Sequence, residues 1–265
     1  MADLPSPIVA ACVPCKCCGG EARLFGVVDF HKNCANAERF KEPSGIPIYY
    51  HRCQHCGFLF TVAFDAFSLG DFSRWIYNQD YALVDPGYEL ERPKDNARYI
   101  GELFDSSRNI RILDYGGGNG KLAELLRAGG FATVDTYDPL VAQFAARPAD
   151  RYDVVVAIEV AEHTPQPLQT FGDMVQFMKP EGMILFSTTV LPAIFDHIGV
   201  QFWYVAPRNG HVSIYSRQSL IHIVTKLGLQ YVRGEESEFW HAIWRQPPPF
   251  ARHLVHPPNA AGSGA

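Results

Sequence analysis

From residue 110 onward, short apolar runs alternate with segments whose apolar positions recur every three or four residues. The runs predict strands near 110–113, 131–137, 153–160, 183–186, 229–232 and 239–244. The segments between them predict helices through Leu122, Leu125 and Leu126, through Leu168, Phe171, Val175 and Met178, and through Leu220, Ile223, Val224 and Leu227. Gly129-Gly130 ends the first of these helices, and Ser216 caps the last. Repeated strand–helix units predict an α/β fold with a doubly wound, mainly parallel sheet over residues 106–246.

The chain before this pattern has a different character. Residues 12–66 are rich in Cys, Gly and Pro with short alternating runs, which indicates small β-hairpins. Residues 67–105 form an aromatic-rich connector ending in a helix that begins near Pro93. The lead at 1–11 lacks a periodic pattern, and residues 247–265 mix Pro with Gly, Ala and Ser, so we expect a mobile lead and a disordered tail.

Composition narrows the possible functions. The chain has 265 residues, 47% of them hydrophobic and 19% charged, which fits a globular protein with one main core. No apolar run reaches the length of a membrane helix, and no signal segment opens the chain, so we expect a cytoplasmic protein without a membrane partner. A net charge of −5 and a pI near 6.0 provide no field to attract nucleic acid. A small-molecule partner fits better, and the oligomeric state is left open.

A glycine-rich loop follows the first strand of the α/β pattern. It reads Asp114, Tyr115, Gly116, Gly117, Gly118, Asn119, Gly120. Glycines at such a turn adopt positive φ and let a ligand approach the backbone, which predicts a nucleotide-type ligand. Glycines at 116, 118 and 120 match the pattern of S-adenosylmethionine (SAM) enzymes, whereas Lys121 stands where a dinucleotide fingerprint needs glycine. The alternative is a tight turn without a ligand.

Two acidic residues flank this loop. Asp114 is placed to shape the turn and receive the ammonium end of the cofactor. Asp138, which ends the next strand and precedes Pro139, is placed to accept hydrogen bonds from ribose hydroxyls, or else to cap a loop. Only about fourteen residues separate Asp138 from Asp153, so the adenine-contacting residue stays unassigned.

These motifs resemble those of the class I SAM-dependent methyltransferases over roughly residues 95–245. The resemblance is carried by the glycine loop, Tyr137-Asp138-Pro139, the run from Ala157 to His163, and Lys179-Pro180-Glu181-Gly182 before a strand. It implies a Rossmann-like sheet, SAM as cofactor and methyl transfer as the reaction.

The cysteines form a second motif. All seven lie in the first 56 residues, and Cys15-x-x-Cys18-Gly and Cys53-x-x-Cys56-Gly each place two thiolates on a tight turn. These four predict a closed, structural Zn²⁺ site in a zinc-ribbon-like module. Substitute ligands are Cys12, Cys17, Cys34, His31, His51 and His55, and free buried thiols are the alternative. The module resembles the amino-terminal zinc-binding domain of some sugar and natural-product methyltransferases.

Glu159, Glu162 and His163 follow a core strand, at the sheet edge where α/β folds bind ligands. Glu159 is expected to orient the amino-acid end of the cofactor, or to cap the turn. We expect Glu162 to contact the acceptor. His163 is expected in acid–base work or acceptor contact, or in a structural hydrogen bond. A Mg²⁺ ion at the Glu162-His163 pair is too weakly indicated to assign.

A long loop, residues 202–213, holds several aromatic and basic residues. His211 is the first choice for general base because imidazole takes a hydroxyl proton near neutral pH, and a buried, hydrogen-bonded histidine is the alternative. Tyr204, Arg208 and Asn209 are candidate catalytic or acceptor contacts, against loop packing. Tyr77 and Tyr81 fit aromatic core packing better than closure over the cofactor.

The function expected from these residues is methyl transfer from SAM to an oxygen or carbon of a small acceptor, with His-assisted deprotonation. A sugar, a nucleotide sugar or a secondary metabolite fits the acceptor. The alternatives are methylation of a protein or peptide docked on the zinc module, and a non-catalytic zinc-ribbon binding protein.

Overall fold

The computed structural model describes residues 9–233 and 239–254. The chain forms two compact units. Unit 1 takes residues from the ranges 1–84, 162–168 and 189–223, and unit 2 from 85–161, 169–188 and 224–265. Within the described residues, no helix is both long and apolar enough to cross a membrane.

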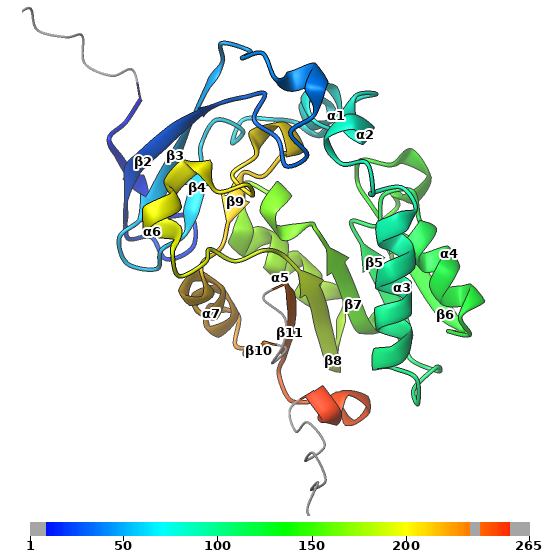
Figure 1. Cartoon of the computed structure of the whole chain (residues 1–265). Coiled ribbons are helices and arrows are strands. Elements are labelled where there is room, and N and C mark those ends of the chain that lie inside the picture. The colour runs from blue at the N-terminus through cyan, green and yellow to red at the C-terminus, as the bar shows by residue number, and fades with distance from the viewer. Residues whose placement is uncertain (1–8, 234–238, 255–265) are drawn as a thin grey trace, which may run out of the picture. The chain divides into compact units, whose positions relative to one another are not determined.

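A five-stranded antiparallel sheet organises unit 1 (Figure 1). Its strands, in spatial order, are β1 (Cys12–Pro14), β2 (Glu21–Asp29), β3 (Pro47–Cys53), β4 (Leu59–Thr61) and β9 (Ser213–Ile214). The first four are the small hairpins expected from the alternating runs. The fifth comes from the far end of the chain, where Ile214 pairs with Leu59 and Ser213 with Phe60.

Short helices complete unit 1. They are α1 (Leu69–Trp75), α2 (Tyr81–Val84) and α6 (Phe195–Ile198), with 3-10 turns at Glu38–Phe40, Gly199–Gln201 and Pro207–Asn209. A capping box begins α1, because the Ser68 hydroxyl accepts from the Asp71 N–H while the Asp71 carboxylate accepts from the Ser68 N–H.

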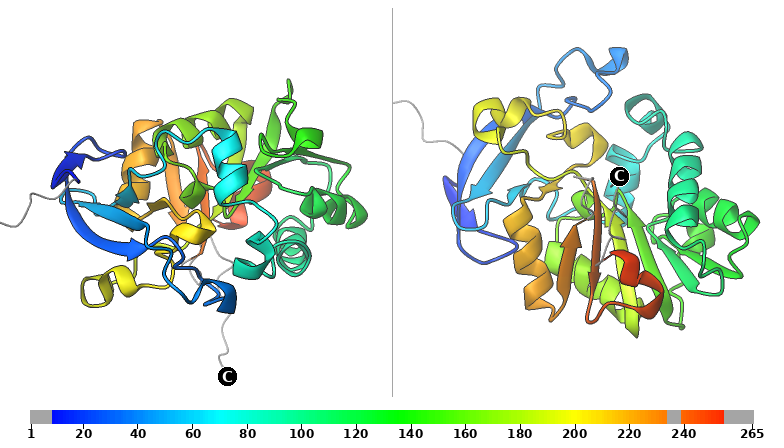
Figure 2. Two further views of the ribbon diagram at one scale, coloured as in Figure 1. Left: turned by 90° about the horizontal axis from the view of Figure 1, so that it is seen from above. Right: turned by 60° about the horizontal axis from the view of Figure 1, so that its bottom comes forward.

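A six-stranded sheet organises unit 2. Its strands, in spatial order, are β10 (Gln230–Arg233), β11 (Trp240–Trp244), β8 (Met178–Ser187), β7 (Tyr152–Ile158), β5 (Arg111–Tyr115) and β6 (Thr133–Tyr137). The last four are parallel to one another, whereas β11 and β10 run antiparallel. The right-hand view of Figure 2 shows β10 and β11 beside β8. The expected mainly parallel α/β sheet is confirmed.

The longer helices are α3 (Glu91–Leu103), α4 (Lys121–Ala128), α5 (Pro167–Phe177) and α7 (Arg217–Lys226), and 3-10 turns lie at Ala142–Phe144 and Ala161–His163. Each predicted helix is present, and α3 begins two residues before Pro93. The Ser216 hydroxyl accepts from the Ser219 N–H and so caps α7 as expected.

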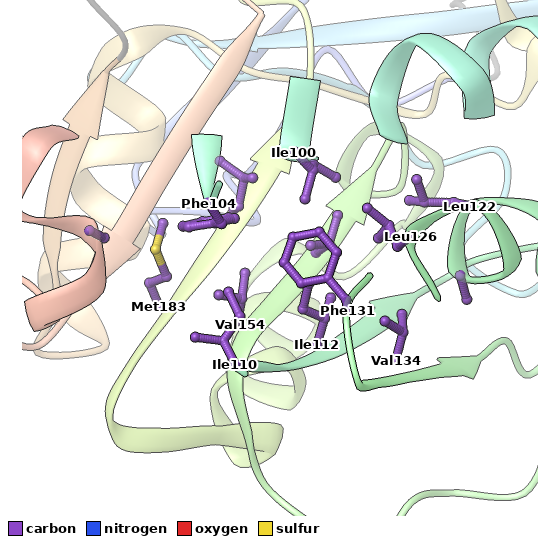
Figure 3. Close-up of a cluster of buried hydrophobic side chains, with 14 of the residues drawn as sticks. Ile100, Phe104, Ile110, Ile112, Leu122, Leu126, Phe131, Val134, Val154 and Met183 are labelled. Atoms are coloured by element: carbon purple, nitrogen blue, oxygen red, sulfur yellow. The ribbon is translucent and has the colours of Figure 1, made fainter. Parts of the chain in front are cut away.

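Helices cover both faces of the sheet in unit 2. On one face, Ile100 and Phe104 near the end of α3 and Leu126 of α4 pack with strand residues such as Ile112 and Val154 (Figure 3). Apolar residues three or four positions apart give each helix this buried face. On the other face, Phe171 of α5 meets Phe186 of β8 with ring centroids 5.1 Å apart. Because successive strand residues point to opposite faces, β8 contributes side chains to the cores on both faces of the sheet.

The described residues nearest the two chain ends pack on the fold, which the composition did not indicate. The expectation of disorder from residue 247 is wrong for Pro249–Leu254, which forms a 3-10 helix with Ala251 buried. Phe250 packs edge-on against Phe104, so apolar burial holds this turn. At the other end, the Ala10 carbonyl lies 2.8 Å from Nε2 of His51. Residues 1–8 and 255–265, which complete the predicted mobile ends, lie outside the described residues.

The units do not coincide with the segments expected from sequence. The proposed domain at 106–246 loses residues 162–168 and 189–223 to unit 1, because β9 adds to the cysteine-rich sheet. The proposed connector at 67–105 divides after Val84, with α1 and α2 in unit 1 and α3 in unit 2.

Candidate functional site

The glycine loop of unit 2 connects β5 to α4. Gly116, Gly118 and Gly120 have φ of 71°, 55° and 74°, in the left-handed region that favours glycine. At Gly117 the constraint is space, because a Cβ would lie 2.3 Å from Oδ2 of Asp114 and 2.8 Å from Cγ2 of Thr136. The loop therefore presents bare backbone above two side chains, as a bound cofactor would require.

Asp114 lies beneath this loop with only 2% of its surface exposed. Its Oδ2 is buried and has no hydrogen-bond partner among the described residues. Burial, and then the charge of Asp138, raise the pKa of Asp114 to about 7. A buried carboxylate oxygen without a donor suits a cationic or hydrogen-bonding ligand group, such as the ammonium of SAM.

Asp138 ties the end of β6 to the loop. Its Oδ2 accepts from the Gly118 N–H at 2.9 Å, and its Oδ1 accepts from the Leu140 N–H at 2.8 Å. Asp138 as a whole is 8% exposed. Carboxylate oxygens accept more than one hydrogen bond each, so the ribose contact expected of Asp138 stays a prediction.

Side-chain hydrogen bonds fix two other residues of the loop, Tyr115 and Asn119. The Asn119 amide donates to the Glu89 carbonyl at 3.2 Å and accepts from the Lys121 N–H at 3.0 Å. The Tyr115 hydroxyl donates to Asp173 at 2.9 Å. These bonds fix the loop, and the cofactor roles expected of Tyr115, Asn119 and Pro139 stay predictions.

Glu159 stands at the carboxyl end of β7 in an unusual conformation. Its φ is 53°, one of two positive values among the described non-glycine residues. Its N–H donates to the Ser187 hydroxyl at 3.0 Å. Ser187, at the end of the neighbouring β8, is a residue that sequence reasoning missed. Strained backbone of this kind concentrates at ligand sites, which supports the cofactor role predicted for Glu159.

The four predicted cysteine ligands come together in unit 1. The Sγ atoms of Cys15, Cys18, Cys53 and Cys56 all lie within 4.8 Å of one another. The Sγ atoms of Cys18 and Cys53 are 3.4 Å apart, and those of Cys15 and Cys56 are 3.6 Å apart. Sulfurs at the corners of a Zn²⁺ tetrahedron lie about 3.8 Å apart, so the donor set and its size fit zinc.

Matching turns hold the two pairs. The Gly19 N–H donates to the Cys15 carbonyl and the Gly57 N–H to the Cys53 carbonyl, and both glycines have positive φ. The substitutes lie outside this group of four sulfurs. Cys12 is exposed, and burial raises the pKa of the Cys17 thiol, which is 1% exposed.

Unit 1 also holds the predicted acid–base residues. Glu162 is fully buried, and its Oε1 accepts from the Tyr204 hydroxyl at 2.5 Å. Its Oε2 is buried without a hydrogen-bond partner among the described residues. Nε2 of His163 lies 4.0 Å from Oε1. The structure therefore places Tyr204 and His163 beside the carboxylate of Glu162.

His211 completes this cluster. Its ring centroid lies 5.0 Å from that of His163 and 4.2 Å from that of Tyr204. Nδ1 lies 2.9 Å from the Tyr204 carbonyl, which only accepts, so Nδ1 carries the proton. The neutral ring then holds its lone pair on Nε2. Cys34, expected from sequence only as a substitute zinc ligand, has its Sγ 3.8 Å from the same Nδ1.

Arg208 and Asn209 form hydrogen bonds to other loops of unit 1. The buried Arg208 guanidinium donates to the Ile76 carbonyl at 2.9 Å and to Asn78 at 2.8 Å. The Asn209 side chain accepts from the Cys34 N–H and donates to the Val84 carbonyl. These bonds join separate loops of unit 1, and the acceptor contact expected of Arg208 and Asn209 stays a prediction.

Tyr77 and Tyr81 pack with ring centroids 5.0 Å apart, and Tyr77 lies 6.0 Å from His163. Tyr81 is buried. This contact fits the aromatic packing expected from sequence.

The comparison with protein families decides the class. Residues 88–233, more than half of the chain, match the model described as a methyltransferase domain. This chain belongs to the methyltransferase-domain family. The resemblance to class I SAM-dependent methyltransferases is confirmed, and the methyltransferase is an enzyme that uses SAM.

Known proteins similar to this methyltransferase include two ubiquinone biosynthesis O-methyltransferases. That of Aromatoleum aromaticum is 26% identical over 158 residues, 46% of this chain and 68% of the relative. That of Saccharophagus degradans is 37% identical over 115 residues, 35% of this chain and 48% of the relative. The chain thus spans about half the length of the second relative.

Solved structures show the same fold. An O-methyltransferase family protein from Burkholderia thailandensis superimposes with a TM-score of 0.51 at 14% identity, covering 69% of this methyltransferase and 64% of the other chain. The similarity confirms the Rossmann-like architecture of the methyltransferase and supports its fold alone.

Proposed function

We propose that this enzyme transfers a methyl group from SAM to a hydroxyl oxygen of a small molecule, with His211 as the general base. The observation that carries the proposal is the buried cluster of Glu162, Tyr204 and His211 in unit 1. Titratable groups gathered in the interior at a cost in desolvation are typical of reactive sites.

His211 has the geometry of an oriented base. The bond from Nδ1 to the Tyr204 carbonyl fixes the ring and puts its lone pair on Nε2, the atom proposed to take the proton. An imidazole titrates near neutral pH, so it takes a proton from an acceptor hydroxyl without being permanently charged. Deprotonation increases the electron density on the oxygen that attacks the methyl group.

Glu162 supplies the carboxyl group of the cluster. The Tyr204 hydroxyl, which also accepts from the Thr189 N–H at 3.2 Å, holds one carboxylate oxygen in place. The other oxygen, Oε2, is available to accept a hydrogen bond from an acceptor hydroxyl or from a protonated histidine. Tyr204 is thus a positioning residue in this proposal, and His163 is a second acid–base candidate.

The residues proposed to hold SAM lie in unit 2. They are the loop from Gly116 to Gly120, Asp138, the strained Glu159 and Asp114, whose Oδ2 is buried with no partner in the described part of the chain. When bound, SAM supplies an electrophilic methyl group on a sulfonium. The chain itself contributes orientation and a base, which are the two needs of a direct displacement.

Transfer to oxygen is favoured over carbon because both relatives described above are named O-methyltransferases of ubiquinone biosynthesis. A phenolic or sugar hydroxyl fits the imidazole base. The acidic pI of about 6.0 favours a small acceptor over a polyanion.

The Zn²⁺ ion proposed at the four cysteines has a closed ligand set and a structural role. A cytoplasmic location stays a prediction.

Two measurements test the proposal. Calorimetric titration is expected to show binding of SAM and of its demethylated product, and the absence of both at millimolar ligand contradicts the cofactor site. Methyl transfer is then followed by mass spectrometry with 3,4-dihydroxybenzoate and a nucleotide sugar as acceptor probes. Transfer to a peptide probe alone would instead favour the protein-methylating alternative.

The base is tested by His211→Asn, whose amide keeps a donor near the Nδ1 position. Its transfer rate is expected to fall by about 10²- to 10⁴-fold with SAM affinity retained. The matched control is His197→Asn, because His197 is exposed on α6. A His211→Asn enzyme as active as the control rules out His211 as the base.

A further inference from the structure

The segment that carries His211 continues into the cysteine-rich sheet. Ser213 and Ile214 form β9, which pairs with Phe60 and Leu59 of β4. One residue after His211, the Val212 carbonyl accepts from the Thr61 N–H at 3.1 Å. The chain on the carboxyl side of the proposed base is therefore a strand of the sheet that bears the cysteines.

A side chain of the same sheet contacts His211 directly. Tyr50 lies on β3, is fully buried, and donates its hydroxyl hydrogen bond to the His211 backbone carbonyl at 2.7 Å. Three residues later the same strand ends at Cys53, one of the four clustered cysteines. His211 is itself 4% exposed, so water does not readily replace this donor.

The second cysteine turn is attached to the same segment. The Ser216 hydroxyl, five residues after His211, donates to the Cys56 carbonyl. Strand β4 begins at Leu59, three residues after Cys56. The turn that holds two of the four sulfurs is thus bonded to the chain just beyond β9.

We propose that the cysteine-rich sheet positions His211 for catalysis, and that Tyr50 is the positioning residue that acts on it directly. The inference rests on the proposed function, in which His211 is the base. The Nδ1 bond to the Tyr204 carbonyl sets the tautomer, and that bond requires the His211 backbone to stay in register. A module that resembles a separate zinc domain in sequence then forms part of the acid–base site.

The test measures the His211 ring rather than turnover. Long-range ¹H–¹⁵N correlation spectra of ¹⁵N-histidine-labelled, zinc-loaded protein report which ring nitrogen is protonated. The His211→Asn protein identifies the His211 signals among those of the ten histidines. In the wild type, His211 is expected as a single form protonated on Nδ1.

Tyr50→Phe removes only the hydroxyl and keeps the buried ring. Its expected result is loss of the single Nδ1-protonated form in favour of mixed tautomers, with zinc content and SAM affinity unchanged. Tyr49→Phe is the matched control, because Tyr49 directly precedes Tyr50 in β3 and points to the other face of the sheet. It is expected to leave the His211 signals as in the wild type.

An unchanged His211 signal in Tyr50→Phe overturns the inference. So does an equal change in Tyr49→Phe, which shows a general loosening of the sheet. Failure of the proposed function is distinguishable, because it is seen as full methyl transfer by His211→Asn whatever the Tyr50 variant does to the spectrum.

Discussion

The glycine loop of unit 2 and the acid–base cluster of unit 1 are built in opposite ways. The loop takes its shape from consecutive residues, and the carboxylate that fixes it lies twenty positions away, at the end of the next strand. The cluster joins Tyr50 to His211 across 161 positions and Glu162 to Tyr204 across 42. A contiguous motif needs only its local geometry, whereas a dispersed one needs the whole unit to fold first.

This difference predicts what each region depends on. Closing long chain segments costs conformational entropy, which the packed sheet and the proposed metal must offset in unit 1. The loop depends instead on the absence of side chains at a few positions. Substitution of a clustered cysteine should therefore lower the stability of the protein. Substitution of a loop glycine should lower its affinity for SAM.

The largest effect is expected for Cys53→Ser. Removing one of four thiolates is expected to lower the zinc content from about one ion per chain to near zero, since a structural Zn²⁺ site supplies much of its module's folding free energy. The melting temperature is expected to fall by roughly 10 °C. Elemental analysis and calorimetry measure the two quantities.

The matched control for that variant is Cys12→Ser, because Cys12 is exposed and lies outside the group of four sulfurs. Full zinc retention in Cys53→Ser, or equal zinc loss in both variants, contradicts the assigned ligand set.

The next largest effect is expected for Gly117→Ala. The new methyl group would lie 2.3 Å from Oδ2 of Asp114, so the loop must shift. SAM affinity is expected to fall about 100-fold, or roughly 2.7 kcal/mol, with little loss of secondary structure. Titration calorimetry measures this, with Gly87→Ala as the control because a Cβ there meets nothing within 4 Å. Equal SAM affinity in the two variants refutes the loop assignment.

The smallest effect is a pH dependence due to Asp114. Burial, with the charge of Asp138, raises its pKa from 3.8 to about 7 in the folded protein, so the folded state binds the proton more tightly. Its stabilising contribution is full below about pH 4 and is lost as the pH rises through 7, at about 1.4 kcal/mol per pH unit. The Asp114→Asn enzyme lacks this slope.

Urea unfolding at about pH 5 and about pH 7 measures that difference. The unfolding free energy of wild type is expected to decline relative to Asp114→Asn as the pH rises, and the exposed-site control Asp105→Asn should follow the wild type. Parallel curves for wild type and Asp114→Asn show that Asp114 is ionised throughout this range.

Much of the fold follows from the residue pattern along the chain. The helices through Leu122 and Leu220 and the core strand before Glu159 were predicted from apolar spacing, glycines and a serine cap. The pairing of two cysteine turns was also predicted, because equal local bends with a glycine after each second cysteine favour a shared metal. The turn at Pro249–Leu254 was missed, because its composition is typical of a tail while its order comes from packing on Phe104.

By itself the sequence determined the class of the enzyme, its Rossmann-like sheet and the glycine-rich loop after the first parallel strand, because these depend on periodicity and on motifs a few residues long. Only the tertiary structure decided that Arg208 and Asn209 bond to the distant residues Ile76 and Val84, that Glu162 and His211 share a buried cluster, and that β9 joins the cysteine-rich sheet. Such contacts depend on which distant segments meet, and the residue pattern within each segment does not specify its partner.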